Sequence, residues 1–508
     1  MRVRFAPSPT GALHIGGVRT ALYNYLLAKK HGGTFLLRVE DTDQTRFVSG
    51  AEDYIINSLR WLGIMPTEGQ NIGGEYGPYR QSERKELYGQ YIQQLLNNDK
   101  AYYAFDTPDQ LDNARKVATE NGQNFQYGTA SRMQLDNSLS LAAAETKQRI
   151  ESGAPYVVRM KIPVNEQVIV QDIIRGEVTF ATQELDDKVL MKGDGMPTYH
   201  LANIVDDHLM KITHVIRGEE WLPSAAHHVL LYQSFGWEAT MPQFAHLPLI
   251  LKPDGNGKLS KRDGVKFGFP VFPMDWNTEN EADNFKGFDG AGFEPEAVLN
   301  FLALLGWSSG TDQEMFSLDE LSEAFSLERI NKAGARFNYD KAKWFNQQYI
   351  LAMDNAVLAA KVSPLAEAKG YNVSSEYLQS ACRLMKERVT FAHEILDKGY
   401  YLFDGNLCYD NDVIKKKWKV DFRPKIESTL VVIEDADIEN ATATEEQFKE
   451  FMLVNDLKMG EILPFLRLSL AGTMQGPAVF DMAALLGKTE TTRRIKAGLD
   501  VFDGVIVS

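Results

Sequence analysis

Cysteine is nearly absent from this sequence. Its 508 residues include only Cys382 and Cys408, which are too few for a disulfide framework and form no C-x-x-C pair for structural zinc. Long apolar runs are absent as well: no stretch approaches the roughly 18 residues that a membrane span requires, and the first residues contain no apolar signal-peptide core. We therefore expect a cytoplasmic protein with no membrane partner.

Positive charge is in deficit. The chain has 54 lysines and arginines against 69 aspartates and glutamates, a formal net charge of −15. This balance counts against a general nucleic-acid coat protein, although local basic runs such as 415–419 and 493–496 could still bind phosphate groups. Each run is also compatible with a merely solvated face.

The remaining composition is that of a large folded protein. Hydrophobic residues make up 44% of the chain and charged residues 24%, which is close to the average for globular proteins. At roughly 150 residues per domain, the length predicts about three or four domains. No internal repeat and no low-complexity tract is visible, which argues against a solenoid.

The amino-terminal residues predict a strand, a turn and a helix. Apolar and charged residues alternate over 2–5, prolines and Gly11 then break the chain, and apolar residues at helical spacing follow. A second strand is predicted over 34–40. This order predicts a parallel βαβ unit, whose ligands bind where loops leave the carboxyl ends of the strands. We therefore expect the loops 8–17 and 40–43 to share one crevice.

The rest of the chain changes character twice. From about residue 86 to 200, charged helical segments are followed by β-rich segments, which we interpret as an inserted domain. The α/β character resumes after residue 200, so we expect the insertion to split the sheet. From about Glu294 onward the apolar spacing is almost wholly helical, for example between Tyr377 and Ile395, and predicts helical bundles.

Two short motifs carry residues suited to a phosphate site. Residues 7–17 form a proline- and glycine-rich turn into a helix, whose start presents unpaired N–H groups, and His14 adds a further donor. Residues 258–262, Lys-Leu-Ser-Lys-Arg, place three cations on a glycine-flanked loop that could close over a polyphosphate. Taken separately, the first motif is compatible with an ordinary helix entry and the second with a solvated basic loop.

Taken together, the two motifs resemble the HIGH and KMSKS signatures of class I aminoacyl-tRNA synthetases. Further motifs, in the same order along the chain, resemble the bacterial-type glutamyl-tRNA synthetase family in particular. They cover nearly the whole chain and stand at residues 4–11, 38–43, 77–82, 197–208, 215–221, 344–350, 470–472 and 483–488. So many separated motifs in order make a chance match implausible.

The resemblance implies a fold class and a domain order. The fold would be an α/β Rossmann-type catalytic domain split by an inserted acceptor-binding α+β domain, followed by all-α stem-contact and anticodon-binding helical bundles. The expected boundaries are 1–85 and 201–265 for the two catalytic halves, 86–200 for the insertion, 266–350 for the stem-contact domain and 351–508 for the anticodon-binding domain.

The resemblance also implies an enzyme, a glutamate–tRNA ligase. It would attach L-glutamate to tRNA(Glu) through glutamyl-adenylate, converting ATP, with its Mg²⁺, to AMP and pyrophosphate. No zinc is expected, because Tyr102–Phe105 stand where zinc-binding members of the family carry their first cysteines and both cysteines of this chain lie far away in the sequence. We further expect a monomer.

The site residues implied by the resemblance fall into two sets. His14, Lys258 and Lys261 are the expected catalytic groups. The expected ATP-binding residues are Pro7, Ser8, Thr10, Gly11, His14, Gly16, Gly17, Glu220, Lys258, Ser260 and Lys261. A substrate with two carboxylates and an ammonium needs fixed cations and at least one anion. The matching positions are Arg4, Ser8, Glu40, Tyr199, Asn203 and Arg217, with Glu40 expected to hold the ammonium and no residue expected to bind a metal.

Arg388 matches the position at which discriminating members of the family read the anticodon. The two transfer RNAs for glutamate and glutamine differ at the third anticodon base, cytosine against guanine. A guanidinium offers only donors, so it can bond the acceptor edge of cytosine, whereas guanine brings N–H donors of its own. The alternative is an exposed helix arginine or a local ion pair.

Rival functions remain at this point. A glutaminyl-tRNA synthetase would carry a β-barrel anticodon half, which the helical pattern here argues against, and a truncated tRNA-modifying paralogue would lack that half altogether. A catalytically silent tRNA-binding relative is the rival from a different class, and the intact residues of the two motifs speak against it. Aminoacylation of both transfer RNAs would separate these functions.

Some features receive no function from the sequence. His227, His228 and His246 lie in apolar contexts, which are typical of core or surface histidines. Asp41 and Asp43 are expected to be structural. The stretch 269–289, rich in proline, asparagine and glycine, is predicted to be an extra loop.

Overall fold

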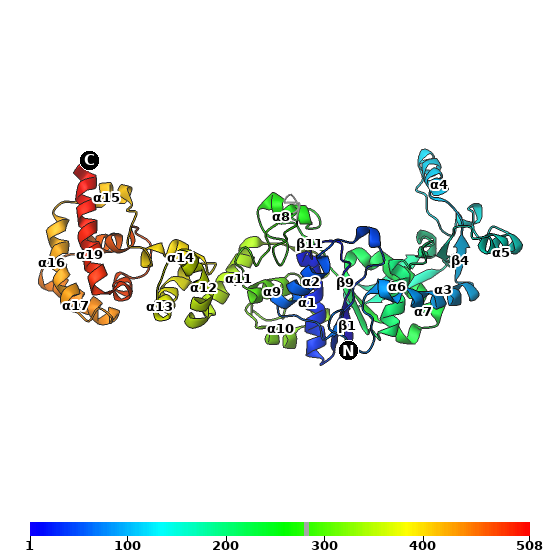
Figure 1. Cartoon of the computed structure of the whole chain (residues 1–508), viewed down its shortest axis with the longest axis horizontal. Coiled ribbons are helices and arrows are strands. Elements are labelled where there is room, and N and C mark those ends of the chain that lie inside the picture. Colours follow the sequence, from blue (N-terminus) through cyan, green and yellow to red (C-terminus); the bar gives the residue numbers. More distant parts are fainter. Residues whose placement is uncertain (279–283, 508) are drawn as a thin grey trace. The chain divides into compact units, whose positions relative to one another are not determined.

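The computed structural model describes residues 1–278 and 284–507, which divide into two compact units (Figure 1). The first unit comprises Met1–Ala291 and Pro295–Tyr339, and the second comprises Gly292–Glu294 and the chain from Asp340 onward. The predicted loop 269–289 lies partly outside the described residues, at positions 279–283.

A seven-stranded sheet forms the centre of the first unit. Its strands lie in the order β3-β2-β1-β9-β10-β6-β7, and all neighbours are parallel except β6 and β7. The strands are β1 (Arg2–Phe5), β2 (Thr34–Leu37), β3 (Glu68–Gly69), β6 (Gln167–Asp172), β7 (Gly176–Ala181), β9 (His214–Gly218) and β10 (Gln243–Leu247). Val3, Phe35 and Val215 are buried, as the strands of a covered parallel sheet require.

Helices cover this sheet. The predicted first helix is α1 (Ile15–Lys30), which packs against β1, β2 and β9, while α7 (Leu222–Phe235) packs against β6 and α6 (Tyr199–Leu209). The other helices of the unit outside the inserted segment are α2 (Ala51–Trp61), α8 (Lys261–Phe267), α9 (Pro295–Ala303) and α10 (Leu318–Ala324), and α9 and α10 pack against α1. Strands β11 (Ile250–Leu251) and β12 (Ala335–Arg336) form a separate two-stranded parallel sheet in the same unit.

The strand order changes direction between β1 and β9. On one side the chain runs outward through β2 and β3, and on the other it runs from β9 to β10. The loops that follow β1 and β9 therefore leave the sheet in opposite directions, which opens a crevice at the carboxyl ends of these two strands. This is the edge at which the sequence places its site residues.

The stretch 86–200 contributes to two sheets. It contains a three-stranded antiparallel sheet with three helices: β4 (Ala101–Ala104), β5 (Val157–Met160), β8 (Val189–Met191), α3 (Lys85–Asn97), α4 (Pro108–Glu120) and α5 (Ala143–Glu151). Strands β6 and β7 of the same stretch instead extend the central sheet beside β10. The boundaries of an inserted domain therefore stay a prediction.

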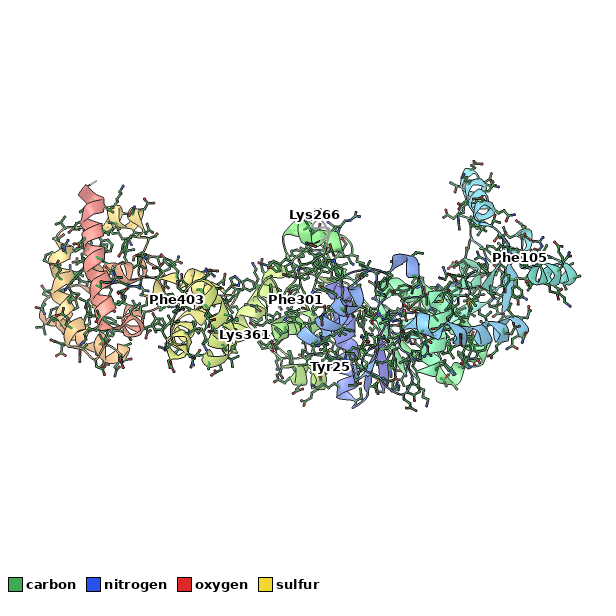
Figure 2. The ribbon with its side chains drawn as sticks, in the orientation of Figure 1. Tyr25, Phe105, Lys266, Phe301, Lys361 and Phe403 are labelled. Carbon is green, nitrogen blue, oxygen red and sulfur yellow. The ribbon has the colours of Figure 1, made fainter. Side chains whose placement is uncertain are left out.

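The described residues of the second unit contain helices and no strand. These helices are α11 (Tyr339–Ala352, whose first residue belongs to the first unit), α12 (Asn355–Ala368), α13 (Ser375–Met385), α14 (Glu394–Lys398), α15 (Asn411–Lys417), α16 (Phe422–Asp435), α17 (Ala441–Val454), α18 (Met459–Ala471) and α19 (Val479–Val507). Aromatic rings contribute to the core: the Trp418 ring lies 4.9 Å from Phe465 and 5.2 Å from Phe502. Phe403 (Figure 2) stacks on Tyr371 at 5.3 Å.

One predicted helix is interrupted. The apolar spacing from Tyr377 to Ile395 predicts continuous helix, but α13 ends at Met385, a 3₁₀ turn follows over Lys386–Arg388, and Val389 is extended. Next to the start of α14, the Glu394 carboxylate accepts hydrogen bonds from the backbone N–H groups of Thr390 and Phe391 at 2.6 and 3.2 Å, and such side-chain bonds favour a turn over a continued helix. Arg388 consequently lies in a turn after the helix.

No helix in 1–278 or 284–507 combines the length and the apolar character needed to cross a membrane.

Candidate active site

A cavity of about 930 Å³ lies at the carboxyl ends of β1 and β9. Residues from both predicted sets line it: Arg4, Pro7, Ser8, Thr10, His14, Gly16, Gly17, Glu40, Tyr199, Asn203, Arg217, Glu220, Lys258, Ser260 and Lys261. Gly11 is not among the lining residues, but a Cβ added there would lie 3.3 Å from the Lys261 ammonium. Its φ of 123° also favours glycine. The structure thus brings the two motifs together.

His14 uses its two ring nitrogens differently. It is the N-cap of α1, and its Nδ1 accepts a hydrogen bond from the backbone N–H of Gly16 at 3.1 Å. In a neutral imidazole the proton must then sit on Nε2. Burial, with Lys261 and Lys258 nearby, lowers the pKa of His14 to about 4, so the ring is neutral at pH 7. Nε2 is buried and has no hydrogen-bond partner within the described chain, which leaves a donor available to a ligand.

The lysine motif is partly helical rather than wholly a loop. Ser260 is the N-cap of α8, held by the carboxylate of Asp263 at 2.8 Å from its backbone N–H and 2.6 Å from its hydroxyl, so Lys261 is the first residue of a helix. Burial lowers the pKa of Lys261. Lys258 forms an ion pair with Glu220 at 2.8 Å. Both lysines line the cavity, Lys258 through its pair with Glu220 and Lys261 at the first position of α8.

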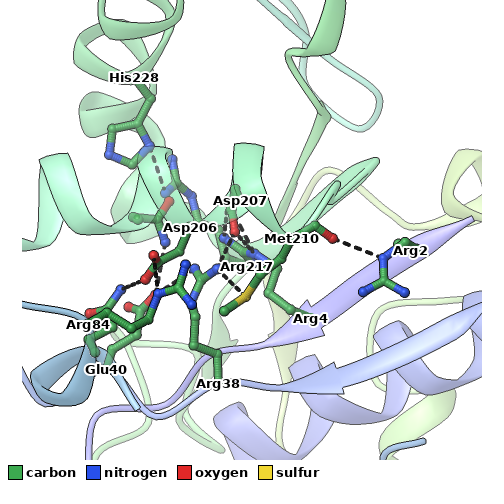
Figure 3. A network of polar contacts seen from close by, with 12 residues as sticks. Arg2, Arg4, Arg38, Glu40, Arg84, Asp206, Asp207, Met210, Arg217 and His228 are labelled. Carbon is green, nitrogen blue, oxygen red and sulfur yellow. Dashed lines mark hydrogen bonds and ion pairs between the residues drawn. The ribbon is translucent and has the colours of Figure 1, made fainter. Parts of the chain in front are cut away.

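A buried network of guanidinium and carboxylate groups adjoins the cavity, and its members Arg4, Glu40 and Arg217 line it (Figure 3). Arg4 donates to both oxygens of Asp207 at 3.1–3.3 Å, and Arg38 bridges Asp207 at 2.8 Å and Glu40 at 2.9 Å. Asn203 donates to Glu40 at 3.0 Å. Burial alone would raise the pKa of Asp207, but the guanidiniums of Arg4 and Arg38 hold it below its ordinary value.

The charged groups of this network are held in buried pairs. Arg4 and Arg38 pair with the carboxylates of Asp207 and Glu40. Arg217 is linked through His246 to the buried carboxylate of Asp172. The sequence motifs contain Arg38 and Asp207, but no role had been predicted for either.

Arg217 has the most contacts of the predicted residues. Its Nη1 donates to the Tyr199 hydroxyl at 2.8 Å and lies 3.3 Å from His228 Nδ1, while its Nε donates to His246 Nε2 at 3.0 Å. Both histidines are fully buried. Two of the three histidines that received no function from the sequence thus touch a predicted substrate-binding residue; no sequence signal marks them.

The segment after α8 reaches both signature motifs. The carbonyl of Val271 accepts a hydrogen bond from Ile15 N–H at 3.0 Å, at the start of α1. The Phe272 ring meets the His14 ring edge-on at 5.9 Å and the Lys261 ammonium at 5.8 Å. The described part of the predicted extra loop therefore packs against the residues expected to bind ATP.

Metal ligands are lacking in the part of the chain that the structure describes, where no group of three or more histidine, cysteine, aspartate or glutamate side chains could hold an ion. Cys382 is buried and Cys408 exposed, each with a free thiol. At the position of the missing zinc cysteines, Tyr102 donates to Asp187 at 2.6 Å, and Arg132 pairs with the same carboxylate at 3.2 Å. A buried ion pair thus stabilises this region.

Arg388 lies in the second unit, in the turn after α13. Its Nη1 donates to the Leu384 carbonyl at 3.1 Å and lies 3.8 Å from the Glu387 carboxylate. The side chain is 39% exposed, so the guanidinium keeps donors that face solvent.

Family models match two parts of the chain. Residues 1–344 match the model described as "tRNA synthetases class I (E and Q), catalytic domain", and residues 357–499 match "Anticodon binding domain". Together with the parallel sheet and the two motifs around one cavity, this defines the chain as a class I aminoacyl-tRNA synthetase, with a helical anticodon domain.

Individual relatives show which family within the class I aminoacyl-tRNA synthetases the chain resembles. The chain is 54% identical to a glutamate–tRNA ligase of Flavobacterium johnsoniae, over 98% of this chain and 99% of the relative, and 52% identical to one of Parabacteroides distasonis, over 99% of each. A crystal structure of a glutamate tRNA ligase from Elizabethkingia meningosepticum in complex with its amino acid superposes with a TM-score of 0.95 at 47% identity, covering 99% of both chains. The chain belongs to the glutamate–tRNA ligase family.

Proposed function

We propose that this cavity binds ATP and L-glutamate side by side and that the enzyme attaches L-glutamate to tRNA(Glu) in two steps. In the first step an α-carboxylate oxygen of glutamate attacks the α-phosphorus of ATP, forming glutamyl-adenylate as pyrophosphate leaves. In the second step the terminal ribose 2′-hydroxyl of the tRNA attacks the activated carbonyl carbon, and AMP leaves. Neither step requires a covalent bond to the protein, so catalysis consists of positioning and charge stabilisation.

The ATP half of the proposal rests on the first motif and the lysine motif. The amino end of α1 and the Nε2–H of His14 donate to phosphate oxygens, and the ammonium groups of Lys258 and Lys261 offset the negative charge that moves to pyrophosphate. The turn before α1, with Pro7, Ser8, Thr10, Gly11, Gly16 and Gly17, lets the nucleotide approach the backbone, and Glu220 and Ser260 border it. Support comes from the unpartnered Nε2 of a neutral His14.

The glutamate half rests on the guanidinium network. Arg4 and Arg217 bind substrate carboxylate, Glu40 holds the ammonium, and Ser8, Tyr199 and Asn203 complete the pocket. Glutamate offers a charged side-chain carboxylate to these guanidiniums, whereas the side-chain amide of glutamine is neutral. This amide would also present N–H groups to arginine donors.

Mg²⁺ belongs to the proposal as a companion of ATP. Carboxylates at the cavity are already engaged: Asp41 accepts from Ser82, and Glu220 pairs with Lys258. With no ready-made group of metal ligands among the described residues, the ion would be held chiefly by phosphate oxygens and water. When bound, it would neutralise phosphate charge.

The wider setting is also part of the proposal. The stretch 86–200 would hold the acceptor end of the tRNA, 266–350 its stem, and 351–508, with Arg388, its anticodon. We further propose a monomer that works in the cytoplasm without zinc.

One observation carries the proposal: phosphate-directed donors and the guanidiniums of Arg4 and Arg217 line the same cavity. Aminoacylation with purified tRNA(Glu) and tRNA(Gln), each offered glutamate or glutamine, tests it. We expect glutamyl-tRNA(Glu) only, and we expect Lys261→Ala to raise the activation barrier by about 2 to 4 kcal/mol while leaving the fold intact. Equal use of glutamine by the unmodified enzyme, or no charging of either tRNA, would refute it.

A further inference from the structure

Arg217 lies next to a hydrogen-bonded pair, His246 and Asp172, that does not line the cavity. Arg217 and His246 are register partners on the parallel strands β9 and β10, which places both side chains on the same face of the sheet. The Arg217 Nε–H donates to His246 Nε2 at 3.0 Å, and His246 Nδ1 lies 2.6 Å from Asp172 Oδ2. Asp172 ends β6, the next strand of the sheet.

This geometry fixes the proton on the imidazole. The backbone N–H of His246 also donates to Asp172 Oδ2 at 3.0 Å, and the backbone N–H groups of Ile174 and Arg175 donate to its Oδ1 at 2.9 and 2.8 Å. Both carboxylate oxygens are thus acceptors, so His246 Nδ1 must carry the proton. Its Nε2 then presents a lone pair, which is what the Nε–H of an arginine requires.

Charge and burial agree with a neutral ring. His246 is fully buried, and burial lowers its pKa although the Asp172 hydrogen bond opposes this shift. A second donor on Nε2 would face the Arg217 guanidinium directly. The imidazole therefore acts as a fixed acceptor.

The contacts of Arg217 leave one edge for a ligand. Nε is used by His246, and Nη1 by Tyr199 and His228. Within the described chain, Nη2 makes only one long contact, 3.4 Å to the Trp221 carbonyl. Arg217 lines the cavity, whereas His246 and Asp172 do not. Holding Nε in place therefore aims Nη2 at the cavity.

We propose that Asp172 and His246 form a positioning pair that aims the Arg217 guanidinium at a carboxylate of the substrate and thereby sets the affinity for glutamate. Neither residue touches the substrate, and both act through Arg217. The inference rests on the carboxylate-binding role proposed above for Arg217. It adds a specificity-determining pair from two strands outside the signature motifs.

Steady-state kinetics with two variants of one residue test the pair. His246→Leu removes the acceptor, while His246→Gln keeps an oxygen near the position of Nε2. We expect His246→Leu to raise the KM for glutamate about 10- to 100-fold, by analogy with the loss of outer partners of metal-ligating side chains, with the KM for ATP unchanged. His246→Gln should restore most of the glutamate affinity.

His227→Leu is the matched control. His227 is another buried histidine of the first unit, but its Nε2 contacts the Asp186 carbonyl at 2.9 Å rather than Arg217. A glutamate KM that is unchanged in His246→Leu, or raised equally in His227→Leu, would overturn the proposal. So would a KM for ATP that rises in parallel in His246→Leu, because that result indicates general disruption.

A measurement on the unmodified enzyme covers the case in which His246→Leu does not fold. The measurement is NMR of protein labelled with ¹⁵N in histidine. The His246 signals are those lost in His246→Gln. They should show a protonated Nδ1 and an unprotonated Nε2 from pH 6 to 8. An Nε2–H form or a cation at pH 7 would overturn the proposal. If the unmodified enzyme charges tRNA(Glu) with glutamate and these results still fail, the positioning pair is wrong and the proposed function stands.

Discussion

His14 combines a structural and a chemical role in one side chain. Its Nδ1 caps α1, and its Nε2–H remains free for a ligand. Asparagine is a preferred N-cap and offers an acceptor near the position of Nδ1, but it has no donor in place of Nε2. We expect His14→Asn to slow adenylate formation by about 3 to 4 kcal/mol, as loss of one preorganised donor does. Single-turnover kinetics should show this while the melting temperature changes little; an unchanged rate would contradict the role.

The same residue predicts a pH dependence of stability. The pKa of His14 is about 4 in the folded chain against an ordinary 6.5, so between these values the unfolded chain binds more protons. Its contribution to folding is complete above pH 6.5 and is lost as the pH falls towards 4. We expect His14→Asn to lose less unfolding free energy than the unmodified enzyme between pH 6.5 and 4.5 in denaturant titrations. The pKa of half-buried His200 is lowered in the same way, but His200 contributes equally to both proteins.

Arg4 is both a cavity residue and one half of a buried ion pair. Removing one partner of such a pair costs about 3–5 kcal/mol of stability, and here it also removes a proposed partner of the substrate carboxylate. We expect Arg4→Ala to lower the melting temperature and to raise the glutamate KM steeply without improving the use of glutamine. Thermal unfolding and aminoacylation kinetics measure the two effects.

Arg84 supplies the control for Arg4. It forms an equally buried pair with Asp206 at 2.8 Å and does not line the cavity. Arg84→Ala should therefore lose stability while a folded fraction keeps the glutamate KM of the unmodified enzyme. If both variants change KM alike, the effect of Arg4 comes from stability alone.

At the scale of elements, the segment after α8 contacts both signature motifs through Phe272. Phe272 is buried, packs against His14 and Lys261, and stacks on Phe285 at 3.6 Å. Phe272→Ala should cost about 3–5 kcal/mol of stability, as other buried phenylalanines do. It should also slow adenylate formation, because it loosens the Lys261 ammonium and the His14 donor. Phe267→Ala, at a half-exposed ring that stacks on Phe269 instead, should do neither. Calorimetry on both variants measures the change in stability, and ATP–pyrophosphate exchange measures the change in the rate of adenylate formation.

The elements also show how far the sequence could lead. Arg4 and Arg217 could be predicted to meet because each stands near the carboxyl end of a strand, where parallel sheets bind ligands. His246 could not be predicted to meet Arg217, because that contact depends on the register of β9 against β10, which apolar strands do not reveal. The end of α13 could not be predicted either. The apolar spacing continues past Met385, and it does not reveal that the Glu394 carboxylate accepts a hydrogen bond from the Thr390 N–H in the next turn.

At the scale of the whole molecule, tRNA choice is proposed to rest on a different compact unit from the cavity. The exposed guanidinium of Arg388 is anchored by one bond to the Leu384 carbonyl. We expect the unmodified enzyme to charge tRNA(Glu) and largely to refuse tRNA(Gln), and Arg388→Gln to relax this refusal, because an amide offers an acceptor to guanine as well as donors. Charging assays with both transfer RNAs measure the ratio. Efficient charging of tRNA(Gln) by the unmodified enzyme would show that the assignment is wrong.

The place of β1 between β2 and β9 has a consequence for biosynthesis. Val3 pairs with His214, so one neighbour of the first strand leaves the ribosome more than two hundred residues after it. At about 5–20 residues per second, β1 waits on the order of ten seconds or longer with an open edge. Arg4 and Arg217 are thus translated far apart in time, and the proposed amino-acid pocket is completed late in translation. A nascent chain interrupted before β9 lacks both Arg217 and the lysine motif.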